Sequence, residues 1–100
     1  MIRILFLKRS PHYIGEMAQK ELLKKLFGEA LHNARVSRHM SAYRLAKLIG
    51  HQQSRIALLE RGESDLRLSS ICGLLEVLNM TPGELLDDMW SRYLQHKDTE

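Results

Sequence analysis

Histidine, cysteine and paired carboxylates are the side chains whose spacing most often signals catalysis or metal binding, and here their spacing signals neither. The chain has five histidines, none of them in a pair at metal-ligand spacing: His12, His32, His39, His51 and His96. Its single cysteine, Cys72, excludes an internal disulfide, and its position on an apolar helical face predicts burial in the core. The sequence also contains no phosphate-binding glycine loop and no nucleophile elbow. We therefore expect no catalytic residue, no metal ion and no cofactor, and an enzyme is the class we expect least.

The distribution of charge is more informative than these groups. The net charge is +3, but residues 1–56 carry 11 lysines and arginines against 3 acidic residues. Residues 57–100 carry 4 against 9, so a basic half of +8 precedes an acidic half of −5. This split indicates a polyanionic partner for the first half, and the alternative is chance clustering on solvated helix faces.

Length and composition indicate one small helical domain. One hundred residues suffice for a single modest core, and 44% of them are hydrophobic. Leucine occurs 18 times, against 10 for valine, isoleucine and threonine together, which favours helix over sheet. No apolar run approaches the roughly 20 residues that a membrane span needs, and the first residues are too short an apolar stretch for a secretory signal. We expect a cytoplasmic protein with no membrane partner.

The spacing of apolar residues predicts five helices. The first covers about 15–38, with Gly28 as a weak point, so its firm part is expected to begin near that glycine. Two short helices follow, 42–49 after the capping Ser41 and about 53–60 before Gly62, joined by a turn at Gly50. That pair has the layout of a helix-turn-helix. The fourth helix covers 68–78, and Thr81-Pro82-Gly83-Glu84 forms a capping box for the fifth, 82–94.

The two ends of the chain are predicted to lie outside this helical unit of residues 16–94. Residues 1–15 read as an N-terminal extension that forms a short strand, a frayed basic arm, or a dispensable segment if Met17 is the start of translation. Residues 95–100 read as a polar tail.

Several motifs fall in one order along the chain. They are Arg35 late in the first helix, Leu45-Ala46-x-x-x-Gly50, Ile56-x-x-Leu59-Glu60-x-Gly62, and Leu75-x-x-Leu78 followed by Glu84-Leu85. In this order and spacing, the segment 28–86 resembles the Cro and phage-repressor type of helix-turn-helix domain, the XRE family. The layout is also similar to the small controller proteins of restriction–modification systems. The resemblance implies an all-α, five-helix, lambda-repressor-like domain of prokaryotic or phage origin that binds double-stranded DNA and associates with the nucleoid when bound.

The resemblance also assigns roles within the helix-turn-helix. It implies a structural ion pair between Arg35 and Glu60. It places the third helix in the major groove, with base contacts from Gln53, Ser54, Ala57 and Leu58. For Leu58, burial in the core or a dimer contact is an equal alternative. The phosphate contacts that it implies come from Gln52, Arg44, Lys47, Arg55 and Arg61, and the alternative for each basic residue is a solvated side chain.

Two positions depart from the family pattern. Many members carry Gln or Glu directly after the capping serine of the second helix, where this chain has Ala42. The loop after Gly62 is often basic in phage repressors, but here it is Glu63-Ser64-Asp65. We therefore expect weaker non-specific DNA binding and a greater dependence on dimerisation.

The fifth helix is the expected dimer interface. Its apolar residues exceed what a small domain needs, and the predicted contacts are Leu86, Met89, Trp90 and Tyr93. The alternative is that Trp90 and Tyr93 fold back over the first helix. The leading hypothesis is a homodimeric transcription regulator, a repressor that binds a palindromic operator. The alternative function is an antitoxin or another interaction module that neutralises a partner protein, such as a toxin, and also regulates its own operon.

Overall fold

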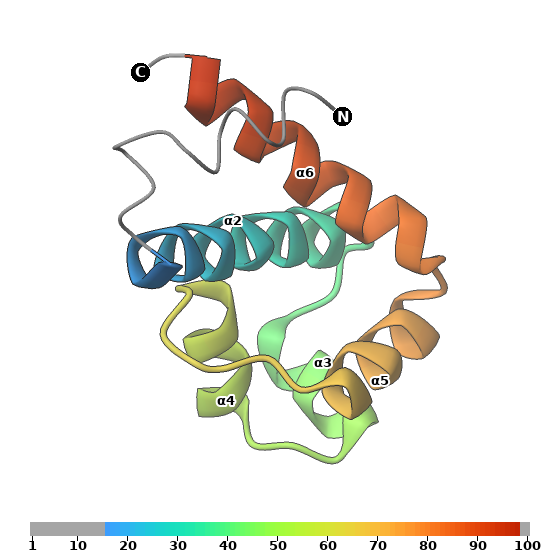
Figure 1. Cartoon of the computed structure of the whole chain (residues 1–100). Helices are drawn as coiled ribbons and strands as arrows, with labels where there is room; N and C mark the ends of the chain where they lie inside the picture. The colour runs from blue at the N-terminus through green and yellow to red at the C-terminus, as the bar shows by residue number, and fades with distance from the viewer. Residues whose placement is uncertain (1–15, 99–100) are drawn as a thin grey trace.

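The computed structural model describes residues 16–98, which form five α-helices and no strand (Figure 1). The helices are α2 (Glu16–Ser37), α3 (Ala42–Ile49), α4 (Gln53–Glu60), α5 (Leu68–Leu78) and α6 (Pro82–Asp98). The predicted all-α fold with five helices is confirmed. The strand considered for residues 1–15 lies outside the described residues.

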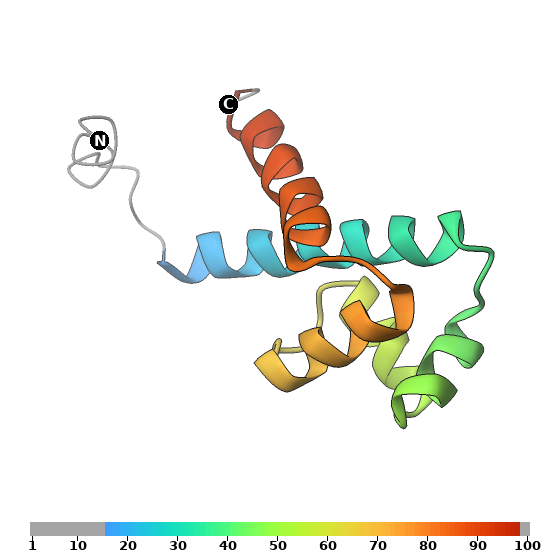
Figure 2. The ribbon, with the colours of Figure 1, turned by 90° about the vertical axis from the view of Figure 1, so that its right-hand side faces the viewer.

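The long helix α2 separates the molecule into two sides. Helix α6 crosses one side of α2, while α3, α4 and α5 gather on the other, as both views show (Figures 1 and 2). The core lies where these helices meet, and its largest fully buried side chains come from all five helices: Phe27, Leu31, Leu45, Ile56, Leu59, Leu74, Leu78 and Leu85. The helix-turn-helix and α6 therefore occupy opposite sides of one shared core.

The starts of α3 and α6 are fixed by side-chain caps that the sequence predicts. The hydroxyl of Ser41 accepts a hydrogen bond from the backbone N–H of Arg44 at 3.0 Å, which caps α3. Thr81 and Glu84 form the reciprocal capping box of α6, with bonds of 2.8 and 3.1 Å. The helix ends use left-handed residues, with φ of 55° at His39, 74° at Gly50 and 54° at Asn79.

Helix α2 is one continuous element, and Gly28 has a different role from the expected weak point. A Cβ on Gly28 would lie 2.5 Å from the carbonyl oxygen of Leu59 and closer still to that of Glu60. The glycine therefore lets the end of α4 approach the backbone of α2. Because α4 and α6 pack along α2, tertiary contacts outweigh the low helix propensity of this residue.

Two further expectations differ from the structure. Helix α6 ends at Asp98, four residues beyond the predicted end, so residues 95–98 belong to the helix instead of a tail. His96 and Lys97 lie in its last turn, where basic side chains favour the helix dipole. Cys72 is exposed, so its predicted burial is wrong, because α5 turns Leu74, Leu75 and Leu78 inward. Within residues 16–98, no helix is long and apolar enough to cross a membrane.

Candidate nucleic-acid interface

Helix α4 is held on the core by one face and leaves the other accessible. Ile56 and Leu59 are fully buried, with 0% and 1% exposure. On the opposite side the residues predicted to contact bases are exposed, apart from the half-buried Ala57: Gln53, Ser54, Ala57 and Leu58. Leu58 is 36% exposed, so the core does not enclose it as it encloses Ile56 and Leu59. The four side chains share one accessible strip of α4.

The turn before α4 sets the position of its first residues. Gly50 adopts a left-handed conformation, and the N–H of His51 donates to the carbonyl of Ala46 at 2.8 Å. Gln52 is the N-cap of α4 but makes no cap hydrogen bond with its side chain. The exposed amide of Gln52 is therefore available to a partner, next to the N-terminus of the helix.

No carboxylate lies in the chain between Glu29 and Glu60. The same thirty residues hold five basic side chains: Arg35, Arg38, Arg44, Lys47 and Arg55. This segment contains all of α3 and all of α4 except its last residue. Apart from Glu60, whose largely buried carboxylate pairs with Arg35, α3 and α4 therefore carry no negative side chain, and this favours phosphate binding.

The predicted phosphate contacts fall into different environments. Arg44 and Lys47 are exposed on α3. Arg61 is exposed but its guanidinium donates to the carboxylate of Glu63 at 3.3 Å. Arg55 is half-buried, and its Nη2 donates to the hydroxyl of the buried Ser70 at 3.5 Å. This placement favours packing of α4 against α5 as the role of Arg55 over a phosphate contact.

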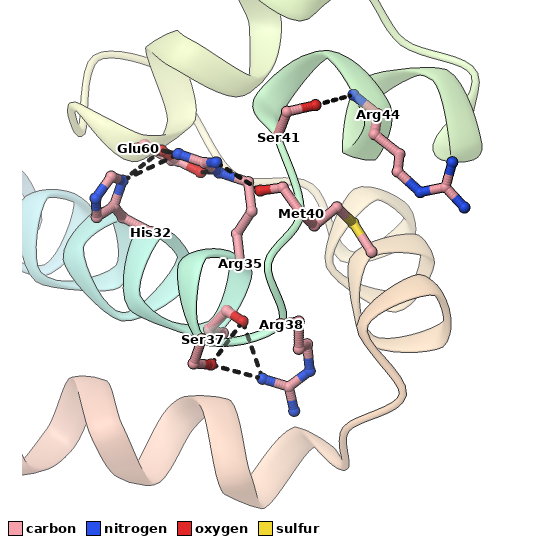
Figure 3. Close-up of polar contacts among 9 residues, drawn as sticks. His32, Arg35, Ser37, Arg38, Met40, Ser41, Arg44 and Glu60 are labelled. Carbon is pink, nitrogen blue, oxygen red and sulfur yellow. Dashed lines mark hydrogen bonds and ion pairs between the residues drawn. The ribbon is translucent and has the colours of Figure 1, made fainter.

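Arg35 and Glu60 meet at the junction of α2 and α4 (Figure 3). The guanidinium donates Nε to Oε2 at 2.6 Å and Nη2 to Oε1 at 3.0 Å, which is a two-point contact. Its Nη1 donates to the carbonyl of Met40 at 2.8 Å, in the loop that leads to α3. His32 adds a bond from Nδ1 to Oε1 at 2.9 Å, in the tautomer with the proton on Nδ1. One arginine therefore links α2, the α3 loop and the end of α4.

The protonation of Glu60 follows from this enclosure. Its side chain is 10% exposed and that of Arg35 13%. Burial by itself raises the pKa of Glu60, but the hydrogen bonds from Arg35 and His32 outweigh burial and hold the pKa below its usual range. The same contact raises the pKa of Arg35 against the opposing effect of burial. The pair is therefore fully charged near neutral pH.

The sequence from residue 30 to 89 matches the profile of the Cro/C1-type HTH DNA-binding domain. This match covers more than half of the chain. The chain belongs to the Cro/C1-type HTH family.

Solved structures agree with this family. The restriction–modification controller protein C.AhdI from Aeromonas hydrophila is 33% identical, with a TM-score of 0.59, over 61% of this chain and 92% of that protein. Two structures of the clp gene regulator ClgR from Corynebacterium glutamicum share the fold, at 20% and 19% identity. Their TM-scores are 0.71 and 0.67, and they cover 77% and 69% of this chain and 83% and 88% of theirs. No curated protein gave a significant sequence match.

In this Cro/C1-type domain, the acidic loop after α4 is partly neutralised inside the chain. Asp65 lies 3.5 Å from Nζ of Lys24 and 3.9 Å from Nζ of Lys20, both on α2. Glu63 pairs with Arg61, as described above. The loop carboxylates are therefore directed toward basic side chains of the same chain, and they reduce the free positive charge of α2 and of Arg61.

The residues predicted to form a dimer interface on α6 differ in exposure. Leu86 and Trp90 are 41% and 51% exposed, and Met89 is half-buried against the core. Tyr93 is only 9% exposed, stacks on Trp90 at 5.2 Å, and accepts a hydrogen bond from Gln19 of α2 at 3.0 Å. The alternative of folding back over the first helix thus fits Tyr93, while Trp90 remains accessible.

Two polar residues at the end of α2 were missed by the sequence analysis. Arg38 donates Nε to the carbonyl of Leu78 at 2.6 Å and Nη1 to the carbonyl of Ala34 at 3.0 Å, which ties α2 to the end of α5. His32 joins the Arg35–Glu60 pair. The i, i+3 spacing of His32 and Arg35 places them on one helix face and could have indicated the contact with Glu60. No comparable signal exists for Arg38, whose partners are backbone carbonyls.

Proposed function

We propose that this chain is a homodimeric transcriptional repressor that recognises a palindromic operator with α4 in the major groove. The observation that carries the proposal is the accessible strip of α4, which starts with Gln53 and Ser54 and lies in a segment without carboxylates. A glutamine amide can pair with the N6 and N7 atoms of adenine, and a serine hydroxyl can serve either base type. Repression follows from occupancy of the operator and requires no chemistry.

The dimer is supported by the place of α6. Helix α6, which carries the exposed Leu86 and Trp90, lies on the side of α2 opposite to α3 and α4, so pairing through α6 leaves both recognition helices uncovered (Figure 2). The half-sites of a palindromic operator lie about one helical turn apart, ~34 Å, so the proposed dimer must hold its two α4 helices at this separation. We propose Leu86, Met89 and Trp90 as the contact, with Tyr93 as internal support.

Titration of the protein against random and genomic duplexes at several salt concentrations tests DNA binding. We expect sequence-selective binding whose logarithmic dissociation constant depends linearly on the logarithm of salt concentration. A folded protein that binds no duplex, or binds all duplexes equally, contradicts the proposal.

Two adjacent glutamines provide a matched test of base contact. Gln53→Ala should relax discrimination at one base position and cost about 1–3 kcal/mol at the preferred base. Gln52→Ala removes only a phosphate contact in this proposal, so it should weaken all sequences equally. Equal behaviour of the two variants contradicts the assignment of Gln53.

Sedimentation analysis tests the dimer. Leu86→Asp places a charge in the proposed contact and should shift the chain to monomers and weaken operator binding. Leu68→Asp is the control, because Leu68 is 77% exposed at the start of α5, away from α6. A monomeric wild-type protein, or equal effects of both variants, excludes the α6 interface.

The antitoxin alternative depends on free acidic residues in the second half of the chain. Several of these are already paired internally: Glu60 with Arg35, Glu63 with Arg61, Asp65 with Lys24, and Asp88 with Arg92. This pairing leaves less negative charge for a basic partner and favours the repressor.

A further inference from the structure

Tyr43 and Lys47 form a fixed pair on the outer face of α3. They are one helical turn apart, and Nζ of Lys47 donates to the hydroxyl of Tyr43 at 3.2 Å. The same nitrogen lies 5.3 Å from the centre of the tyrosine ring. Tyr43 is nevertheless 57% exposed, and Lys47 is exposed too. A large aromatic side chain is therefore held by a neighbouring lysine while more than half of it stays exposed.

A second lysine–tyrosine pair, on α6, provides a comparison in which the tyrosine supports helix packing. Nζ of Lys97 lies 5.8 Å from the ring centre of Tyr93 on α6. The Tyr93 ring is buried, and its hydroxyl accepts a hydrogen bond from Gln19 at 3.0 Å. There the hydroxyl supports the packing of α6 on α2.

The hydroxyl of Tyr43 is in a different state. It accepts from Lys47, and within residues 16–98 its own O–H has no acceptor. Lys47 keeps further N–H donors, because it makes no ion pair with any carboxylate among residues 16–98. Arg44, which follows Tyr43 in sequence, is also exposed and adds a further positive charge to α3. The result is a cluster of donors without a protein acceptor, which suits an oxyanion.

We propose that Tyr43 and Lys47 together form a binding site for one backbone phosphate of the DNA that α4 contacts. The site rests on the proposed function, because α3 packs directly against α4, the helix proposed to contact the bases. The phosphate accepts hydrogen bonds from the O–H of Tyr43 and from Nζ of Lys47. The contact is independent of base sequence. It extends the predicted phosphate contact of Lys47 by a neutral donor, the hydroxyl of Tyr43, which Lys47 itself holds in place.

The variants Tyr43→Phe and Lys47→Gln separate the two parts of the site. Tyr43→Phe keeps the ring and removes one hydroxyl, so we expect binding about fivefold to tenfold weaker for every sequence, with the salt slope unchanged. Lys47→Gln removes a charge, so it should also reduce the magnitude of the salt slope by about 0.9. Because both donors serve one phosphate, the double variant should lose less than the product of the single losses.

Lys97→Gln is the matched control, since it breaks the pair on α6, and it should leave DNA affinity and salt slope unchanged. Thermal unfolding of each variant checks that the fold is retained. If the wild type binds DNA and Tyr43→Phe binds equally well, the site is wrong while the proposed function stands. The same holds if Tyr43→Phe changes discrimination at single bases. If the folded wild type binds no DNA, both fail.

Discussion

Two neighbouring regions of the molecule pair acidic with basic side chains, and they do so in opposite ways. In the α2–α4 junction, formed by Gly28, His32, Arg35 and Glu60, the carboxylate is 10% exposed and has a two-point contact with the guanidinium. In the acidic loop, residues 63–65, the carboxylates of Glu63 and Asp65 are 56% and 75% exposed, and their contacts are longer: one of 3.3 Å for Glu63, and two of 3.5 and 3.9 Å for Asp65. Only two residues separate Glu60 from Glu63.

Burial determines what each region contributes. If one partner of a buried ion pair is removed, the other charge stays buried without a counter-charge, which is strongly destabilising. The α2–α4 junction therefore governs stability and the orientation of α4. An exposed pair is screened by water and salt and contributes little to stability. Its effect is on the charge available at the DNA-facing surface. Three variants and one pH series test this division.

Gly28→Ala should have the largest effect. The added methyl group meets two backbone carbonyl oxygens of α4 rather than a flexible side chain, so α2 and α4 must separate. We expect the free energy of unfolding to fall by about 3 kcal/mol, despite the better helix propensity of alanine. Urea denaturation measures the loss, with Gly73→Ala as a control because nothing lies near that position. An unchanged midpoint for Gly28→Ala would mean that the close approach is not required.

Glu60→Gln should be nearly as costly. The amide keeps the shape but removes the negative charge that Arg35 and His32 share, which leaves a largely buried guanidinium without a counter-charge. The expected loss is about 3 kcal/mol in urea denaturation. Asp65→Asn, an equivalent change in the acidic loop, should cost less than about 0.5 kcal/mol. Similar losses for the two would remove the distinction between the regions.

Low pH should reduce the difference in unfolding free energy between the wild type and Glu60→Gln. The pKa of Glu60 is lower in the folded protein than in the unfolded chain, whose value is about 4.3, so the unfolded state takes up the proton first. The stabilisation is fully present above the unfolded value and is lost as pH falls through the folded one. The gap in unfolding free energy between wild type and Glu60→Gln should therefore narrow from pH 5 toward pH 3. A constant gap across this range contradicts the assigned pair.

Glu63→Gln should have the smallest effect, and only on DNA. Removal of the carboxylate frees the guanidinium of Arg61, so we expect affinity about two- to threefold tighter at low salt, with stability unchanged. Asp65→Asn is again the control, because its partners lie on α2 and not on α4. Weaker binding of Glu63→Gln in a gel-shift titration would show that the loop assists DNA binding.

The sequence predicted the helices and their caps because each depends on nearby residues. Ser41, Gly50 and the Thr81–Glu84 box act over three or four residues, and the structure contains all of them. The ion pair of Arg35 and Glu60 joins residues 25 positions apart, and the family resemblance implied it before the structure placed the two side chains together.

What the sequence did not predict depends on distant packing. The role of Gly28 is set by carbonyls more than 30 residues away, so helix propensity alone marked it as a weak point. Polarity marked residues 95–98 as a tail, although exposed helical turns are equally polar. The prediction that Cys72 is buried was wrong because α5 is short and mostly apolar. The spacing of its apolar residues therefore did not show which side of the helix faces the core. The environments of Tyr43 and Tyr93 also depend on helix packing, since Tyr43 is exposed on α3 and Tyr93 is buried where α6 meets α2.

The exposed ring of Trp90 has a practical consequence for spectroscopy. It is the only tryptophan of the chain, it is 51% exposed on α6, and it stacks on Tyr93. Its fluorescence therefore originates from one known place, and any molecule that covers α6 should shift the emission to shorter wavelengths and shield the ring from a neutral quencher such as acrylamide. The fluorescence of the unlabelled protein therefore reports whether α6 is covered, and it can be recorded continuously while the protein is diluted.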